Sequence, residues 1–112
     1  MESKSSKFQV AGELAWQAAG EGARRQIMGY DPQLMLVKVE FEKGAVGALH
    51  THPHSQSSYV AEGVFELIIG DEKKTLHKGD GYYVSPDVLH GCTCLEAGIL
   101  IDAFSPVRED FL

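Results

Sequence analysis

The sequence lacks any long hydrophobic run. Its longest aliphatic stretches, Leu67–Ile69 and Ile99–Ile101, are far shorter than the roughly 20 apolar residues that a membrane-spanning helix needs. The first seven residues are polar, and no apolar run follows them. We therefore expect no membrane partner and no signal peptide, and the default location is the cytoplasm.

Positive charge is also scarce. The 112 residues include 16 Asp and Glu against 10 Lys and Arg, which gives a formal net charge of −6. This balance repels nucleic acid and anionic lipid, so neither is an expected partner. It does not exclude a small anionic substrate, because a local cation can hold one.

Cysteine is limited to Cys92 and Cys94, which are two positions apart. In a strand their side chains would point the same way, which is a poor geometry for a bond between them. We expect two free thiols that pack as small hydrophobic side chains. Metal ligation by these thiols is the alternative.

Sustained helical periodicity is missing, and only Leu14–Ala19 suggests a helical turn. Short apolar runs alternate instead with turns rich in Gly, Pro and Asp, a pattern typical of an all-β sandwich or barrel. The length suits one domain over residues 8–112, after a disordered polar tail over residues 1–7. The expected strands are Arg24–Met28, Leu34–Phe41, Ala48–Thr51, Ser57–Ala61, Val64–Ile69, Lys74–His77, Gly81–Val84, Gly91–Leu95 and Ile99–Phe104.

Four residues form a candidate site for one divalent metal ion: His50, His52, Gln56 and His90. Imidazole nitrogens and an amide oxygen are common ligands of such ions. In a strand, His50 and His52 would share a face. Pro53 then bends the chain and can bring Gln56 back toward them. Gln56 is expected as a ligand, or alternatively as a hydrogen-bond partner of a ligand histidine.

The segment from Gly44 to Gly63 resembles the first motif of the cupin family, G(X)5HXH(X)3,4E(X)6G, with Gln56 in place of the usual Glu. The segment from Gly79 to His90 resembles the second motif, G(X)5PXG(X)2H(X)3N, more loosely. Pro86 is retained, but Cys94 stands where Asn is common. The resemblance implies a double-sheet jelly-roll barrel, also called a double-stranded β-helix, that holds a metal ion.

The C-terminal stretch Asp102-Ala-Phe-Ser-Pro-Val-Arg-Glu-Asp-Phe111 resembles the ending of KdgF-type pectin-degradation cupins. Those proteins open the ring of 4,5-unsaturated monouronates to give linear keto sugar acids. The resemblance implies an enzyme whose site is lined by Asp102, Phe104 and Arg108, with a small anionic sugar as substrate. It implies no organic cofactor.

The sequence itself leaves the roles of Asp102 and Arg108 open. Asp102 alternates with Leu100 and Phe104 on one face of an aliphatic strand. Facing the interior, it would have a raised pKa and could serve as a general acid or base. The alternative is a wet barrel mouth or an ion pair. Arg108 could hold a carboxylate with two hydrogen bonds, or balance the neighbouring acidic residues at the surface.

Glutamine in place of glutamate also bears on the chemistry. Three imidazoles and an amide add no negative charge, so the metal would retain its full charge and act as a Lewis acid. Oxygen activation by iron more often recruits a carboxylate. The ligand set fits nickel, zinc, manganese or iron. A cupin dioxygenase and a non-catalytic sugar-binding cupin are the alternative functions.

Because so thin a barrel leaves apolar strands exposed, we expect a homodimer.

Overall fold

The computed structural model describes residues 3–112, and residues 17–105 lie in strands or the short loops between them. The all-β architecture expected from the turn spacing is confirmed. No helix among the described residues is long and apolar enough to cross a membrane. The elements are η1 (Ala11–Glu13), β1 (Gln17–Ala18), β2 (Ala23–Asp31), β3 (Leu34–Phe41), β4 (Val46–His50), β5 (Ser55–Ile69), β6 (Glu72–His77), β7 (Gly81–Val84), β8 (His90–Ser105) and η2 (Glu109–Phe111).

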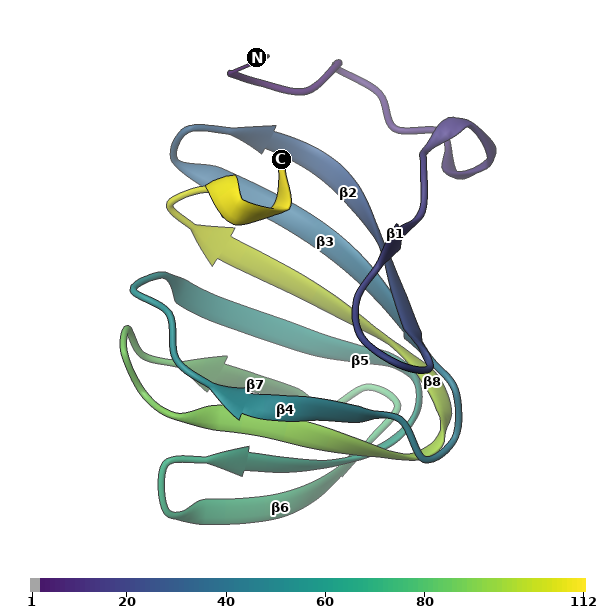
Figure 1. The fold of residues 1–112 in the computed structure, drawn as a ribbon, viewed down its shortest axis with the longest axis vertical. Coiled ribbons are helices and arrows are strands. Elements are labelled where there is room, and N and C mark those ends of the chain that lie inside the picture. The colour runs from purple at the N-terminus through teal and green to yellow at the C-terminus, as the bar shows by residue number, and fades with distance from the viewer. Residues whose placement is uncertain (1–2) are drawn as a thin grey trace.

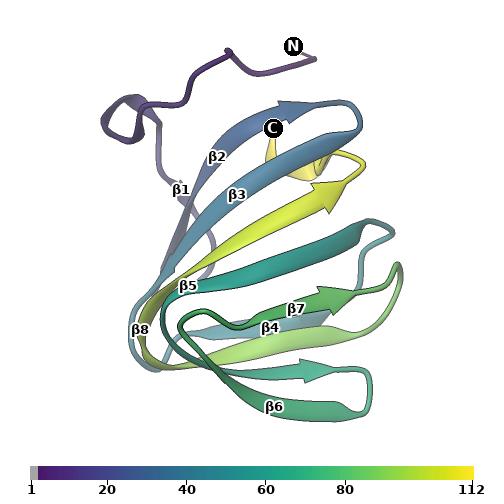
Figure 2. The same cartoon turned by 180° about the vertical axis from the view of Figure 1, so that it is seen from behind.

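Two long strands, β5 and β8, pair antiparallel along nearly their whole length and belong to both layers of the barrel (Figure 1). The larger layer contains β1, β2, β3, the second half of β8, the first half of β5, and β7. The smaller layer contains β4, the first half of β8, the second half of β5, and β6. From behind, the strands of both layers fan out from the bends of β5 and β8 (Figure 2). The space between the two layers is where inward side chains meet.

The bends lie where the sequence predicted breaks between separate strands. Glu62–Gly63 and Glu96–Gly98 were expected as turns, but the backbone continues through both, with register shifts around Gly63. Gly63 has φ +84°, and a β-carbon there would lie 2.6 Å from the carbonyl oxygens of Glu96 and Ala97. Glycine thus allows a bulge and a close backbone crossing, which bend a strand without ending it.

The N-terminal region differs from expectation. Leu14–Ala19 does not form a helical turn; the short 3-10 helix precedes it, and Gln17–Ala18 forms β1 against Arg24–Arg25. Local propensity is overridden here by a hairpin whose turn has Gly20 and Gly22 at positive φ. Residues 1–2 of the expected tail lie outside the described residues. Within the remainder, the backbone N–H of Ser5 donates to the Tyr30 carbonyl at 2.8 Å.

The strand register of the larger layer aligns the candidate site residues in rows that cross neighbouring strands. One row of inward residues runs from Val37 through Asp102 and Ser58 to Tyr82. The next row contains Met35, Phe104, Gln56 and Val84. Leu100, Asp102 and Phe104 are all buried, so the interior placement of Asp102 that alternation allowed is the one observed. The aliphatic and aromatic members of these rows form the core around the polar ones.

We predict that Gly63→Ala lowers the free energy of unfolding by at least ~2 kcal/mol, because it combines an unfavourable φ with a clash against two carbonyl oxygens. Gly12→Ala is the matched control, since no atom lies within 4 Å of the added β-carbon and its φ is not positive. It should change stability by less than about 0.5 kcal/mol. Urea unfolding of both variants measures the difference. Equal stabilities would show that the bend at Gly63 does not need glycine.

Candidate metal centre

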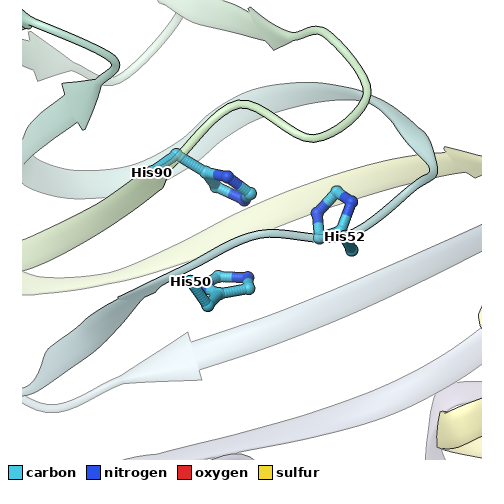
Figure 3. Close-up of side chains that lie close together, drawn as sticks. All are labelled: His50, His52 and His90. Carbon is cyan, nitrogen blue, oxygen red and sulfur yellow. The ribbon is translucent and has the colours of Figure 1, made fainter.

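Three histidines meet between the two layers (Figure 3). His50 is the last residue of β4, His90 is the first residue of β8, and the two are register partners. His52 lies two residues past the end of β4, and its ring still converges with that of His50. One nitrogen from each ring lies within 4.8 Å of the others. Because two nitrogens bound to one ion at about 2.1 Å are at most about 4.2 Å apart, small ring rotations suffice for chelation.

The backbone fixes which nitrogen of each ring faces the centre. The Nδ1 atoms lie against carbonyl oxygens two residues away: Ala48 for His50 at 2.8 Å, His54 for His52 at 3.1 Å, and Val88 for His90 at 2.9 Å. A carbonyl oxygen only accepts, so each Nδ1 must donate its hydrogen. The Nε2 lone pairs are then left for a metal ion, which is the usual arrangement for histidine ligands.

Two contacts at the centre fit a cation better than they fit a metal-free protein. His90 Nε2 is buried and has no hydrogen-bond partner among the described residues. His52 Nε2 lies 2.9 Å from Gln56 Oε1, although both atoms present lone pairs when Nδ1 carries the hydrogen. Two adjacent ligands on one ion, each about 2.1 Å away, would be about 3.0 Å apart at a right angle. The three histidines can therefore form a metal site, and Gln56 is placed to join it.

Burial lowers the pKa of His52 and of His90 below the ordinary histidine value. The cause is the cost of removing an imidazolium ion from water, and it outweighs the hydrogen bonds that favour the charged form. Neutral imidazole is the form that binds metal, so the interior prepares both rings for ligation.

Two hydrogen bonds join Gln56, which contacts His52, to Asp102. Gln56 Nε2 donates to Ser58 Oγ at 3.0 Å, and Ser58 Oγ donates to Asp102 Oδ1 at 2.6 Å. Ser58 thereby fixes the orientation of the Gln56 amide with its oxygen toward His52. Burial raises the pKa of Asp102 to about 6, although the Ser58 hydroxyl and the Arg108 charge both act in the opposite direction. A carboxyl group with this pKa can exchange protons near neutral pH.

A cavity of about 220 Å³ adjoins the histidines, and its wall includes His50, Gln56, His90, Asp102, Phe104 and Arg108. The structure thus brings every predicted site residue to one cavity except His52, which contacts Gln56. Arg108 also makes the ion pair that the sequence left as an alternative. Its Nε and Nη2 lie 3.0 and 2.8 Å from the two Asp110 oxygens, and its guanidinium lies over the Phe104 and Phe111 rings.

Sequence reasoning missed Arg25, Ser58, Tyr82 and Phe111. Ser58 could have been found by alternation, because it lies two residues after Gln56 on the same strand. Arg25, a charged residue between Ala23 and Ile27 on the inward side of β2, carries the same signal. The other two are aromatics for which no spacing separates a cavity wall from a core.

His54 and His77 lie outside the three-histidine cluster. His54 Nε2 donates to the Val107 carbonyl at 3.2 Å, so His54 supports the site from behind His52. His77 is exposed. Cys92 and Cys94 are free thiols, Cys94 fully buried and Cys92 partly so, as predicted. Burial raises the pKa of Cys92 to about 11, which keeps it protonated and unreactive.

Comparison with known proteins identifies the family of this chain. Residues 37–101 match the Cupin domain family. The pectin degradation protein KdgF of Dickeya dadantii (strain 3937) is 44% identical over 108 residues, which cover 95% of this chain and 98% of the relative. The chain belongs to the cupin family, in its KdgF-type group.

Two solved cupins have the same fold. An RmlC-like cupin from Shewanella frigidimarina NCIMB 400 superposes with a TM-score of 0.96 at 44% identity, over 99% of this chain and all of the other. KdgF from Halomonas sp. superposes with a TM-score of 0.90 at 39% identity, over 96% of this chain and all of the other. The similarity therefore extends well beyond the motifs, to the terminal segments on either side of them.

We predict that His50→Ala and His52→Ala each remove most of the bound metal, because one of at most four protein ligands is lost. His77→Ala, an exposed histidine away from the centre, should retain it. Elemental analysis of the purified variants measures the metal. Acidification below about pH 5 should also release metal from this cupin, since the ligands must be neutral and the pKa of His52 and of His90 lies below the ordinary value of about 6.5. Full occupancy in both site variants would refute the assignment.

Gln56→Glu tests the fourth ligand. The carboxylate should tighten the binding of hard cations such as Mn²⁺ and, by adding negative charge to the cavity, weaken the binding of a small anionic ligand roughly tenfold, or about 1.4 kcal/mol. Gln33→Glu adds the same charge at an exposed position and should change neither property. Titrations with metal and with a small anionic sugar by calorimetry measure both effects. If the two variants behave alike, Gln56 does not contact the metal.

Proposed function

We propose that this cupin opens the ring of 4,5-unsaturated monouronates and releases linear 4-deoxy-5-keto uronates. The observation that carries the proposal is the buried carboxyl group of Asp102. It lies in the cavity wall beside the three histidines and is joined to them through Ser58 and Gln56. The relatives named for pectin degradation support the same chemistry.

The size and charge of the cavity suit one acidic sugar ring. A volume of about 220 Å³ is below the range of about 300–1,000 Å³ that is common for small-molecule sites, and so favours a monosaccharide over an oligosaccharide. The guanidinium of Arg108 supplies positive charge at the wall, although the protein as a whole is acidic. A carboxylate is the group that such a cation binds best.

The reaction is an isomerisation and needs no oxidant or second substrate. The substrate is a cyclic enol ether with a carboxylate at C5. When the bond between C1 and the ring oxygen breaks, the C1 hydroxyl becomes an aldehyde and the ring oxygen becomes an enol. A proton lost from oxygen and one gained at C4 then convert the enol to a ketone. The enzyme has to accept and deliver protons while it holds the carboxylate.

The residues of the chain divide these tasks. Asp102 Oδ1 is occupied by the Ser58 hydroxyl, whereas Oδ2 has no hydrogen-bond partner among the described residues and is available to carry a proton. Arg108 holds the carboxylate, and Phe104 forms an apolar part of the wall that excludes water. A divalent metal held by the histidines and Gln56 would supply Lewis-acid stabilisation of substrate oxygens.

Two rivals make different predictions for the purified, metal-loaded protein. A dioxygenase would consume oxygen, and a binding module would bind a sugar without turnover. The decisive assay follows the absorbance of the conjugated C4=C5 bond in an unsaturated monouronate, against the rate of spontaneous ring opening without protein. Failure of the wild-type protein to accelerate the decay would remove the proposed reaction.

We predict that Asp102→Asn lowers turnover ~10²- to 10⁴-fold while metal stays bound, because the amide has a similar size but cannot transfer protons. Asp71→Asn, at an exposed position, should retain full activity. Arg108→Ala should act mainly on substrate affinity, by about 1.5–3 kcal/mol for a charge-assisted hydrogen bond. The ultraviolet assay with metal analysis separates these effects. An equally active Asp102→Asn would keep the function but move proton transfer to another group.

We also propose that the protein acts as a cytoplasmic homodimer. Leu34, Leu36 and Tyr59 are exposed on the strands of the larger layer. Pairing of two copies would remove this apolar surface from water.

A further inference from the structure

Arg25 is a charged residue at an inward position. On β2 it pairs with Val39, and its inward neighbours Ala23 and Ile27 pair with Phe41 and Val37. These partners belong to the apolar lining of the larger layer. Arg25 is half-buried, and its side chain reaches the wall of the cavity that also contains Asp102 and Arg108. A guanidinium in such a place is costly unless a partner compensates for the water that it loses.

No carboxylate forms an ion pair with Arg25 within residues 3–112, although the nearby charge of Asp110 favours the charged form of Arg25 in part. All the ion pairs among those residues involve other cations, and the only hydrogen bond from the Arg25 side chain runs from Nε to Gln17 Oε1 at 3.0 Å. The two terminal nitrogens of Arg25 have no hydrogen-bond partner among those residues. Arg108 differs, because its Nε and Nη2 are both directed at Asp110 and only part of its guanidinium is left for a ligand.

The two arginines meet at one aromatic ring. The guanidinium carbon of Arg25 lies 3.7 Å from the Phe111 ring centroid, and that of Arg108 lies 4.3 Å from it. Gln17 Nε2 donates to the Phe111 carbonyl at 3.0 Å, so the same residue that orients Arg25 also holds η2 in place. The two like charges are thereby kept close together at the cavity wall. Asp110, which pairs with Arg108, offsets their repulsion in part, and a second anion between or beside the two guanidiniums would make the arrangement more favourable.

We propose that Arg25 is a second substrate-binding cation, which forms with Arg108 a two-guanidinium clamp for the carboxylate of an acidic monosaccharide. The inference rests on the proposed function, which it deepens by assigning the group that selects uronates over neutral sugars. Arg108 approaches the carboxylate from the C-terminal segment and Arg25 from β2. The free terminal nitrogens of Arg25 can make the two-pronged hydrogen bonds that Arg108, already paired with Asp110, makes only in part.

The test compares D-galacturonate with its methyl ester, which has the same ring but no charge. For Arg25→Gln, with metal loaded, we expect Kd for the acid to rise about 10- to 100-fold, as for loss of charge-assisted hydrogen bonds, and Kd for the ester to change less than about threefold. KM for the unsaturated uronate should rise in parallel while kcat changes little. Arg24→Gln removes the same charge from the neighbouring exposed position, where Arg24 pairs with Glu40, and should leave both affinities unchanged.

Arg25→Lys is the second variant, for use if Arg25→Gln does not fold. It keeps a positive charge over Phe111 but cannot make the two parallel hydrogen bonds of a guanidinium. It should weaken binding of the acid alone. Equal losses for acid and ester in either variant would mean that Arg25 only supports η2, and would overturn the clamp. So would wild-type protein that binds the acid no better than the ester. Arg25-dependent binding of galacturonate by a protein that fails to turn over the unsaturated uronate would support the clamp and remove only the reaction.

Discussion

The antiparallel pairing of β5 with β8 is the constraint on which the site depends. It aligns Gln56 with Phe104 and Ser58 with Asp102 on inward-facing positions, because directly paired residues of antiparallel strands share a face. The bend at Gly63 then turns the second half of the pair toward the other layer, where His90 starts β8 opposite Ile69. Shifting this register by one residue would turn Asp102 outward and remove the Ser58 contact. The chemistry of the cavity is therefore set by backbone pairing far more than by any single side-chain contact.

A chain of polar contacts couples the two ends of the site: His52 faces the Gln56 amide oxygen, and two hydrogen bonds lead from Gln56 through Ser58 to Asp102. Glutamine can serve in this chain because its amide offers an acceptor to the metal side and a donor to the serine. A glutamate, the usual residue of the motif, could not donate to Ser58 while ionised, and it would place a second negative charge near Asp102. The replacement would thus preserve the charge of a bound metal, and it leaves the serine hydroxyl free to donate to the aspartate. The Gln56 amide therefore orients Ser58 toward Asp102 and also presents its oxygen to the histidines.

Much of the fold could be read from the sequence, since alternation and turn residues give β3 and β7 with the bounds that the structure shows. The three histidines were also identified, because their motif spacing is specific. The errors have physical causes. Breaks were expected at Gly63 and Gly98 because glycine marks both turns and bulges, and only tertiary pairing separates the two. Arg25 was missed because a cavity between layers is made by residues from distant strands, and β2 carries no motif that would relate it to Asp102.

The wall of the cavity carries positive charge, whereas the protein as a whole carries a net negative charge. The chain carries a net charge of −6, yet two guanidiniums lie at the cavity wall beside a centre that can hold a divalent cation. The carboxyl group that faces them has a raised pKa, because burial outweighs the attraction of Arg108. In the proposed reaction, a fully ionised Asp102 would compete with the substrate carboxylate for the same cations, whereas a partly protonated one would compete less and would also carry the proton that ring opening requires. Burial of Asp102 would therefore serve substrate binding and proton transfer together.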